Sequence, residues 1–363
     1  MAFVMPRSGQ LSGQDSAAKW QAIAALFEDR EPLVWLVTGA AGFIGSNLVE
    51  ALLACGQKVI GIDNFSTGFE RNLDEVKALV GDHAWRNFTF SKADICDVSS
   101  CREAVAGVDV VLHQAALGSV PRSIEDPMRT FASNATGFAQ LLNASRQTGV
   151  RRFVYASSSS VYGDHPALPK LEDRVGRVLS PYAATKAIDE LLAEAFSRSY
   201  GIQCVGLRYF NVFGPRQDPD GAYAAVIPKW TASLLRGETV WINGDGQTSR
   251  DFCFVENAVQ ANIRAALVET LPSLHEVFNV AAGKRTTLIE LYSEIKAILQ
   301  DRFGTVVPAE PSFRDFRDGD VKHSLADITK CERLIGFQPT HDVASGLNLA
   351  TEWYVTYLNN AKV

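Results

Sequence analysis

The stretch VTGAAGFIGS, Val37–Ser46, carries three glycines at intervals of three residues. It follows an apolar run, 33–38, and leads into a helical pattern. Glycines are needed where a strand turns tightly into a helix and the backbone must approach a pyrophosphate, whose charge then lies at the helix N-terminus. The stretch therefore predicts a dinucleotide-binding turn built on Gly39, Gly42 and Gly45.

An acidic residue further along supports this interpretation. Asp63 follows the next apolar run, 58–62, and lies 18 residues after Gly45. A carboxylate at the end of the second strand is placed to bind the ribose hydroxyls of adenosine. It would repel the 2′-phosphate of NADP, so the predicted cofactor is NAD. The glycines alone would also fit a tight turn without a ligand, and Asp63 weighs against that alternative.

Further apolar runs alternate with helical patterns, at 88–92, 108–113, 152–156 and 204–209. Strands that are apolar throughout and alternate with helices indicate a parallel sheet covered on both faces. The predicted fold class is α/β: a Rossmann-type doubly wound parallel sheet with a smaller C-terminal α/β substrate-binding domain.

Loop-forming residues at 211–222, NVFGPRQDPDGA, mark the predicted boundary between two domains. Before the sheet, 1–32 is predicted to be an N-terminal helical extension, with an amphipathic helix over 16–30. We expect the cofactor domain to comprise 33–210 and about 255–280. The substrate domain would then comprise 211–254 and 281–363.

Composition excludes several classes of protein. In 363 residues, 47% hydrophobic and 21% charged, no apolar run approaches the roughly 18 residues of a membrane span. The 35 Lys and Arg against 41 Asp and Glu, net charge −6, argue against a nucleic-acid polymer as a partner. The six cysteines lack metal-ligand spacing, so we expect reduced, buried thiols and no metal. The opening segment has no secretory pattern, and a cytoplasmic location is expected.

Tyr182 and Lys186 lie four residues apart in a long helical pattern, 181–200, and so share one face of the helix. Tyrosine, with a pKa of about 10, is a poor base at neutral pH, but a neighbouring ammonium and a nicotinamide cation favour the phenolate. The pair therefore suits proton transfer at an alcohol during hydride transfer. Taken alone, the pair would also fit a solvated helix face.

These features together resemble the extended short-chain dehydrogenase/reductase family, from Leu33 onward. The serine run before Tyr162, SSSSVYG, supplies the third element, because Ser158 falls at the family's catalytic serine. The resemblance implies that Ser158, Tyr182 and Lys186 are catalytic. It also implies an NAD site formed by Gly39, Gly42, Phe43, Ile44, Gly45, Asp63, Asn64, Asp94, Ile95, Gln114, Ala115, Ala116, Asn134, Tyr182, Lys186 and Tyr209.

Within that family the chain most resembles the sugar-nucleotide 4-epimerases. In those enzymes tightly held NAD takes hydride from C4 of a UDP-hexose while the tyrosine removes the 4-hydroxyl proton, and hydride returns to the other face of the 4-ketose. The related 4,6-dehydratases carry an acid pair where this chain has Ser159 and Ser160. Decarboxylases that form UDP-xylose and glucuronate epimerases use Ser or Thr with Tyr and Lys, and remain open.

The resemblance also implies a UDP-sugar site on the substrate domain. Arg250 and Arg317 would bind the diphosphate through charge-assisted hydrogen bonds. The implied substrate-binding residues are Gly118, Ser119, Ser158, Ser159, Asn211, Ala225, Val226, Lys229, Trp230, Trp241, Ile242, Asn243, Arg250, Arg317, Asp320 and Ser324.

Ser324, four residues after Asp320, bears on the substrate class. Epimerases restricted to UDP-glucose and UDP-galactose typically carry tyrosine at this position, and a smaller residue leaves room for an N-acetyl group at C2. The chain thus most resembles epimerases that interconvert UDP-N-acetylglucosamine (UDP-GlcNAc) and UDP-N-acetylgalactosamine (UDP-GalNAc). Ser324 would also fit an ordinary small core residue.

Two alternatives stay open. The first keeps the same machinery but acts on the matching uronic acids, UDP-GlcNAcA and UDP-GalNAcA. The second is a non-catalytic NAD-binding sensor, since fold alone does not fix function. Family members commonly dimerise through the helices that correspond here to 134–148 and 181–200, so the resemblance implies a homodimer.

Overall fold

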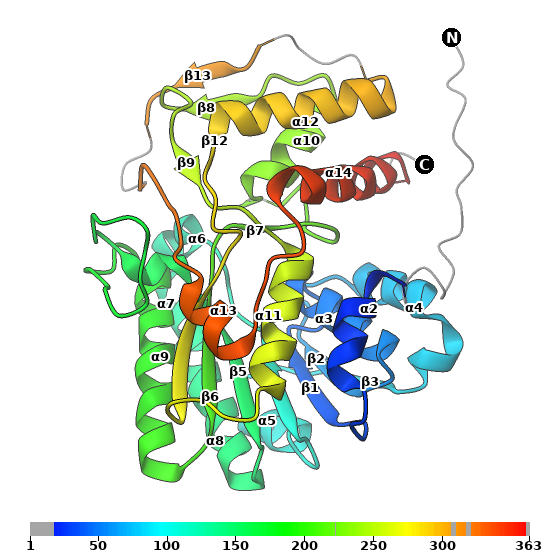
Figure 1. Ribbon diagram of the computed structural model, residues 1–363, viewed down its shortest axis with the longest axis vertical. Helices are drawn as coiled ribbons and strands as arrows, with labels where there is room; N and C mark the ends of the chain where they lie inside the picture. Colours follow the sequence, from blue (N-terminus) through cyan, green and yellow to red (C-terminus); the bar gives the residue numbers. More distant parts are fainter. Residues whose placement is uncertain (1–17, 222, 306–309, 317–320, 361–363) are drawn as a thin grey trace.

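The computed structural model describes residues 18–221, 223–305, 310–316 and 321–360 (Figure 1). A seven-stranded parallel sheet lies at its centre, in the order β11-β6-β5-β4-β1-β2-β3. This confirms the predicted Rossmann-type α/β fold. The strands are β1 (Val34–Thr38), β2 (Lys58–Asp63), β3 (Phe88–Lys92), β4 (Val110–His113), β5 (Arg152–Ser158), β6 (Cys204–Tyr209) and β11 (His275–Val280).

Helices cover both faces of this sheet. One apolar cluster includes residues of α3 (Phe43–Ala54), α4 (Glu70–Trp85) and α11 (Val255–Leu267). The cluster on the other face includes residues of α5 (Val98–Ala104), α8 (Gly137–Thr148) and α9 (Pro181–Tyr200). Because helices cover both faces, the central strands bury both sets of side chains and read as continuous apolar runs.

The bounds of α9 agree with the prediction because both ends carry local signals. Ser180 caps the helix by accepting a hydrogen bond from the Ala183 amide at 3.1 Å, and Pro181 occupies the first position. Gly201, at φ +77°, ends it in the left-handed conformation that glycine adopts most readily. In contrast, β3 is not apolar throughout as predicted. It is an edge strand, and Ser91 and Lys92 are exposed.

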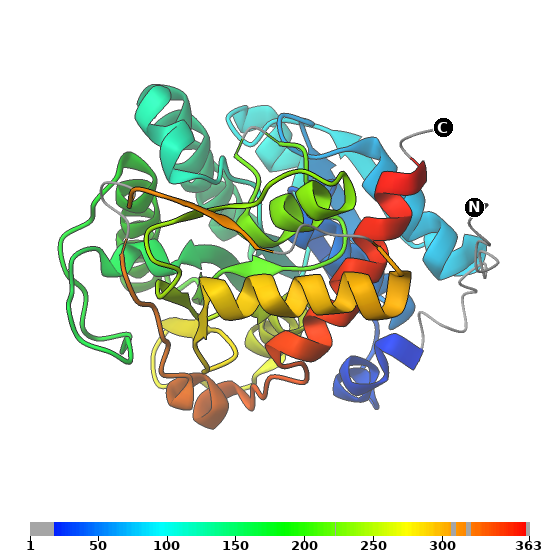
Figure 2. The ribbon, with the colours of Figure 1, turned by 90° about the horizontal axis from the view of Figure 1, so that it is seen from above.

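Most of the chain beyond β6 lies above the sheet (Figures 1 and 2). It has an apolar cluster of its own, which is called the second apolar cluster because it belongs to this second part of the chain. This cluster lies among α10 (Val226–Leu235), α12 (Leu288–Phe303) and α14 (Val343–Asn360), and α12 crosses over α14 in the view from above. Three pairs of short strands accompany these helices: β7 (Val212–Phe213) with β10 (Cys253–Phe254), β8 (Trp241–Asn243) with β13 (Ser312–Arg314), and β9 (Ser249–Arg250) with β12 (Thr286–Thr287). The remaining helices are α6 (Val120–Glu125), α7 (Pro127–Phe131) and α13 (Thr329–Ile335).

Two predictions about this region have different outcomes. The segment 255–280 returns to the first sheet as expected, because β11 pairs in parallel with β6. The segment 211–222, predicted as a loop, contains the strand β7. The local Pro, Gly and Asp residues gave no sign of β7, because it is defined by its pairing with distant β10.

The predicted amphipathic helix over 16–30 is broken in the part that the structure describes. A short helix, α2 (Gln21–Ala24), continues into a 3-10 turn, Ala25–Phe27. Trp20, Ile23 and Phe27 are buried as the apolar spacing predicted, and they join the cluster that contains α3. The backbone at Trp20 leaves helical geometry, at φ −99° and ψ 14°.

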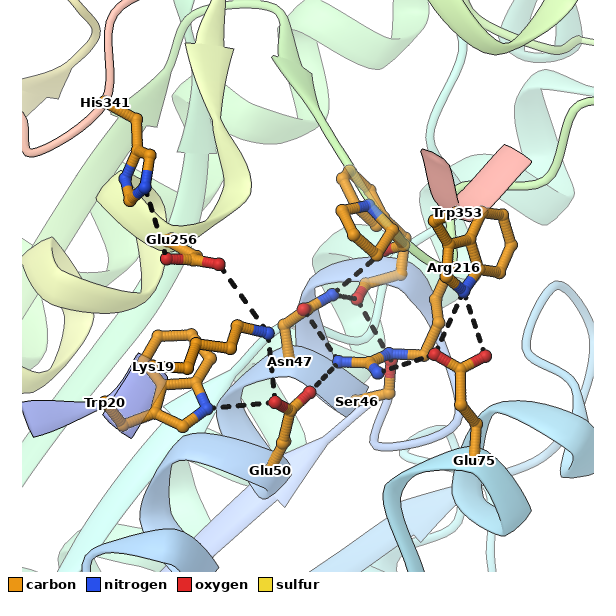
Figure 3. Close-up of polar contacts among 12 residues, drawn as sticks. Lys19, Trp20, Ser46, Asn47, Glu50, Glu75, Arg216, Glu256, His341 and Trp353 are labelled. Carbon is orange, nitrogen blue, oxygen red and sulfur yellow. Dashed lines mark hydrogen bonds and ion pairs between the residues drawn. The ribbon is translucent and has the colours of Figure 1, made fainter. Parts of the chain in front are cut away.

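A buried guanidinium joins the sheet to the second part of the chain (Figure 3). Arg216, after β7, donates to Ser46 Oγ at 3.1 Å and to Asn47 Oδ1 at 2.7 Å. It also forms ion pairs with Glu50 on α3, at 2.5 Å, and Glu75 on α4, at 3.0 Å. The Arg216 and Glu50 side chains are each 1% exposed, so the charges depend on each other for stabilisation.

Burial alone would raise the pKa of Glu50. Arg216 and Lys19 outweigh that effect and lower the pKa to about 2, from 4.5 for an ordinary glutamate. Because the folded-state pKa is the lower one, the ionised carboxylate stabilises the fold above pH 4.5. That stabilisation is lost as the pH falls toward 2.

We expect Glu50→Gln to lower the free energy of unfolding at pH 7 by about 3 kcal/mol, because a buried charge loses its partner. In urea titrations from pH 7 to pH 3, the difference from the unmodified protein should be constant above pH 4.5 and shrink below it. The exposed Glu103 gives a matched control, Glu103→Gln, with little change. A difference that does not vary with pH would contradict this account of Glu50.

Candidate active site

A cavity of about 410 Å³ lies at the carboxyl ends of β1 to β6. This edge is where ligands bind in open α/β sheets. Every predicted cofactor residue except Asp94 and Asn134 lines the cavity. Residues distant in sequence, from the glycine turn, the ends of β4 and β5, and the first turns of α9, thus meet around one space.

The turn between β1 and α3 brings backbone to the cavity wall. Gly39 has φ +66°, which favours glycine, and a Cβ there would lie 2.9 Å from the Ala115 amide nitrogen. A Cβ on Gly45 would lie 2.0 Å from the Gly39 carbonyl oxygen. The turn can be this tight only because Gly39 and Gly45 have no side chains. It leaves bare backbone and a helix N-terminus facing the cavity, which fits a pyrophosphate.

Asp63 holds the adjoining loop and faces the same cavity. Its carboxylate accepts hydrogen bonds from the Ala41 amide at 3.0 Å and the Phe65 amide at 2.7 Å. Burial raises its pKa, although these two bonds oppose the shift. Each oxygen accepts one of these bonds and retains capacity for another donor, so the carboxylate fits ribose hydroxyls.

Asp94 and Asn134 are absent from the lining, and their side chains have other contacts. Asn64 Nδ2 donates to Asp94 Oδ2 at 2.9 Å. Asn134 is 1% exposed and bonds both backbone atoms of Leu117 and the Thr185 hydroxyl. The Asn134 side chain is thus engaged by protein partners, and its assignment as a cofactor contact stays a prediction. It holds the loop after β4 against α9, and so shapes the cavity from behind.

Thr38 and His113 form a further support that the sequence did not indicate. The Ala115 amide donates to Thr38 Oγ1 at 3.1 Å, and the Thr38 hydroxyl lies 2.8 Å from His113 Nδ1. Burial, reinforced by the charge of Lys186, lowers the pKa of His113 to about 3. The imidazole is therefore neutral, and the contact fixes the Ala115 backbone beside the glycine turn.

Tyr182, Lys186 and Ser158 all line the cavity. Lys186 Nζ donates to the Ala156 carbonyl at 2.8 Å and to Asp189 Oδ2 at 3.2 Å. An ammonium has three donors, so two fixed bonds leave one direction free to reach the cavity. Ser158 Oγ accepts the Ser160 amide at 3.2 Å, which leaves its own hydroxyl proton free to be donated.

Asp189 is a member of this cluster that sequence analysis missed. It is fully buried, one turn beyond Lys186 on α9, and its Oδ1 has no hydrogen-bond partner. Burial raises its pKa to about 7, although Lys186 opposes the shift. An acid three residues after a lysine is common on exposed helices, so only the burial distinguishes it.

Of the residues implied for the substrate, the structure brings Gly118, Ser158 and Asn211 to the cavity. Ser119 instead caps α6, accepting the Arg122 amide at 3.3 Å, and Ser159 begins a 3-10 turn. The implied residues on the second part of the chain are outside the lining: Ala225, Val226, Lys229, Trp230, Trp241, Ile242, Asn243, Arg250 and Ser324.

Two of these nine have buried side chains, and their assignment as substrate contacts stays a prediction. Trp230 is 6% exposed and packs edge-on against Tyr292, and Ile242 is fully buried. Both side chains belong to the second apolar cluster. Arg250 lies on β9, and its guanidinium donates to two backbone carbonyls, of Ser249 and Lys322. Arg317 and Asp320 lie outside the described residues.

The described residues contain no group of His, Cys, Asp or Glu side chains that could hold a metal ion. In the same part of the chain, no helix is both long and apolar enough to cross a bilayer. All six cysteines are free, but the expectation that they are buried is wrong for Cys96, which is exposed, and only partly right for Cys55.

Comparison with known proteins places this cavity in context. A model of the NAD dependent epimerase/dehydratase family matches residues 35–281. The chain is 38% identical over 324 residues to a UDP-glucose 4-epimerase of Mycolicibacterium smegmatis, covering 88% of this chain and 97% of that protein. It is 33% identical to a UDP-glucuronate 4-epimerase of Thermodesulfobacterium geofontis, covering 88% and 95%. A solved UDP-N-acetylglucosamine 4-epimerase from Methanobrevibacter ruminantium, in complex with UDP-N-acetylmuramic acid, has 38% identity and a TM-score of 0.81, with 90% and 99% covered.

Proposed function

Because the chain belongs to the NAD dependent epimerase/dehydratase family, we propose that it is a 4-epimerase interconverting UDP-GlcNAc and UDP-GalNAc through a transient 4-keto sugar. One observation carries the proposal: Tyr182, Lys186 and Ser158 line the same cavity as the glycine turn and Asp63. The relatives named as UDP-sugar 4-epimerases support the reaction class.

NAD, when bound, supplies an acceptor and then a donor of hydride for C4 of the sugar. The chain's part in the proposed mechanism is to hold the sugar and move one proton. Tyr182 takes the proton of the 4-hydroxyl and later returns it. Ser158 donates its free hydroxyl proton to the 4-oxygen and stabilises it as its charge changes. Lys186, fixed by Ala156 and Asp189, presents its remaining donor to the cofactor side of the cavity.

We propose a division of labour along the chain. The sheet part, 33–210 and about 255–280, holds NAD, and the part comprising 211–254 and 281–363 holds the UDP-sugar, with 1–32 as a separate extension. The second apolar cluster around α10, α12 and α14 supports a distinct folding unit for the sugar nucleotide.

The choice of acetylated sugars depends on Ser324. The Ser324 amide donates to the Ser249 carbonyl at 3.0 Å, and the Ala326 amide to Asp251 Oδ2 at 3.2 Å. The Leu325 carbonyl also accepts the Lys170 amide, at 2.8 Å. These hydrogen bonds fix the backbone at Ser324 and at the two residues that follow it. The small side chain of Ser324 is therefore held at a fixed place in the fold.

Two alternative functions are considered beside this proposal. A uronic-acid substrate pair is supported by the relative named UDP-glucuronate 4-epimerase. A non-catalytic NAD sensor would have no use for a serine, tyrosine and lysine gathered at one cavity, so the geometry weighs against it.

A substrate panel tests the proposal directly. The protein with NAD is incubated with UDP-GlcNAc, UDP-glucose, UDP-glucuronate and UDP-GlcNAcA, and kcat/KM is measured for each. The proposal requires the highest value for UDP-GlcNAc. A higher value for UDP-GlcNAcA would favour the uronic-acid reading, and no turnover of any sugar would favour the sensor.

Tyr182→Phe should lower kcat by at least about a thousandfold, because the ring remains but the proton acceptor is lost. The Kd for UDP-GlcNAc should change less than about threefold. Product formation followed by NMR and binding followed by calorimetry check both values. Turnover within tenfold of the unmodified protein would remove Tyr182 from the proton transfer.

Ser324→Tyr should exclude acetamido sugars by filling the space beside C2. We expect kcat/KM for UDP-GlcNAc to fall about a hundredfold while UDP-glucose is affected less than about threefold. Ser324→Ala serves as the matched control, because it keeps the space and loses only the hydroxyl. Equal losses on both sugars in the tyrosine variant would overturn the role of Ser324.

We also propose a homodimer that pairs α8 and α9 with their counterparts in a second copy. Large apolar side chains are exposed on α9 and the neighbouring α7: Leu191 is 66% exposed and Met128 is 73% exposed. Sedimentation velocity should give a mass near twice 39.6 kDa. Leu191→Glu should shift it toward the monomer, since burying that charge is costly. A monomeric unmodified protein would contradict the pairing.

A further inference from the structure

Residues 18–27 form a short helical segment that precedes β1 and packs against α3 (Figure 1). The family match begins only at residue 35, so this segment is outside the matched region. Trp20 is 2% exposed, Ile23 4% and Phe27 8%. Three side chains of a segment that precedes the matched region are thus buried in the core.

The segment contributes two donors to one buried carboxylate (Figure 3). Lys19 Nζ lies 2.9 Å from Glu50 Oε1, and Trp20 Nε1 donates to the same oxygen at 3.0 Å. Lys19 also lies 3.6 Å from Glu256 on α11, which in turn is 3.7 Å from His341. Lys19 therefore bridges two helices that cover the same face of the sheet.

Glu50 transmits this contact toward the cavity. Its other oxygen binds Arg216, which also holds Ser46 and Asn47 in the first turns of α3. Gln217, next to Arg216, lines the cavity. A continuous series of hydrogen bonds thus runs from the added segment to the end of α3 where the cofactor's phosphates are expected.

Charge gives a second reason for the contact. A carboxylate beneath a phosphate-binding helix opposes the binding of an anion unless it is neutralised. Glu50 and Glu75 share Arg216, and Glu256 has His341 and Lys19. Without Lys19, three buried or half-buried carboxylates would depend on Arg216 and a histidine. Lys19 and Arg216 together supply the lysine and arginine charges that balance these three carboxylates.

We propose that Lys19 and Trp20 are positioning residues of the cofactor site: they fix and neutralise Glu50, hold the first turns of α3 in place, and so strengthen the binding of NAD. The proposal concerns NAD alone and does not depend on which sugar the protein accepts. It assigns a role in cofactor binding to a segment outside the family match.

Calorimetric titration of the full chain with NAD, without any sugar, tests the proposal. Lys19→Met should raise the Kd for NAD about five- to tenfold, and Lys19→Arg should stay within twofold because it keeps the charge and the donors. The exposed Lys77 on α4 provides the control: Lys77→Met removes the same charge elsewhere and should leave Kd within twofold.

Trp20→Phe keeps a buried ring but removes the donor to Glu50, and it should raise the Kd about two- to fourfold. If Lys19→Met does not fold, the Kd of Trp20→Phe for NAD tests the proposal in its place. A Kd within 1.5-fold of the unmodified protein in whichever of these variants folds would overturn the proposal. An equal rise in Lys77→Met would also overturn it, because the effect would then be one of net charge. A chain that binds NAD as described but turns over no sugar would refute only the proposed function.

Discussion

The close contact between Gly45 and the Gly39 carbonyl is the constraint on which the site depends. Because no side chain separates them, a turn of only four residues, 39–42, connects β1 to α3, and the N-terminus of α3 faces the cavity. The position of α3 also determines where the residues of its next turns lie. Ser46, Asn47 and Glu50 follow on the next turns of α3, where Arg216 from the second part of the chain binds all three. The turn that we propose as the cofactor site is therefore also a point at which the two parts of the chain meet.

Much of the fold could be predicted because its signals are local. The bounds of β3, β6 and α9 agree with the sequence pattern, and the glycine turn, Asp63, Tyr182 and Lys186 come together at one cavity. The sequence signal for each of these features lies within a few residues, although the folded positions also rest on contacts with distant residues, such as that of Lys186 with Ala156. Ser180 and Gly201, for example, define both ends of α9 without any tertiary contact.

Two of the features that sequence analysis missed depend on partners far apart in the chain. Arg216 and Glu50 are 166 positions apart in the sequence, and Thr38 and His113 are 75 apart. Neither pair has a sequence spacing from which the contact could be predicted. Trp230 and Ile242 fit a sugar-binding pattern, yet both side chains pack into the second apolar cluster. Asn134 was predicted as a cofactor contact from the sequence alone, which gave no sign that its amide holds the loop after β4.

The central claim is that one closed site breaks and re-forms the same C–H bond at C4 of an acetylated UDP-sugar. UDP-GlcNAc labelled with deuterium at C4, incubated with the protein and NAD in ordinary water, tests it most directly. The account predicts that the UDP-GalNAc formed carries the deuterium at C4, as read by NMR. UDP-GalNAc with ordinary hydrogen at C4, or no UDP-GalNAc at all, would contradict it.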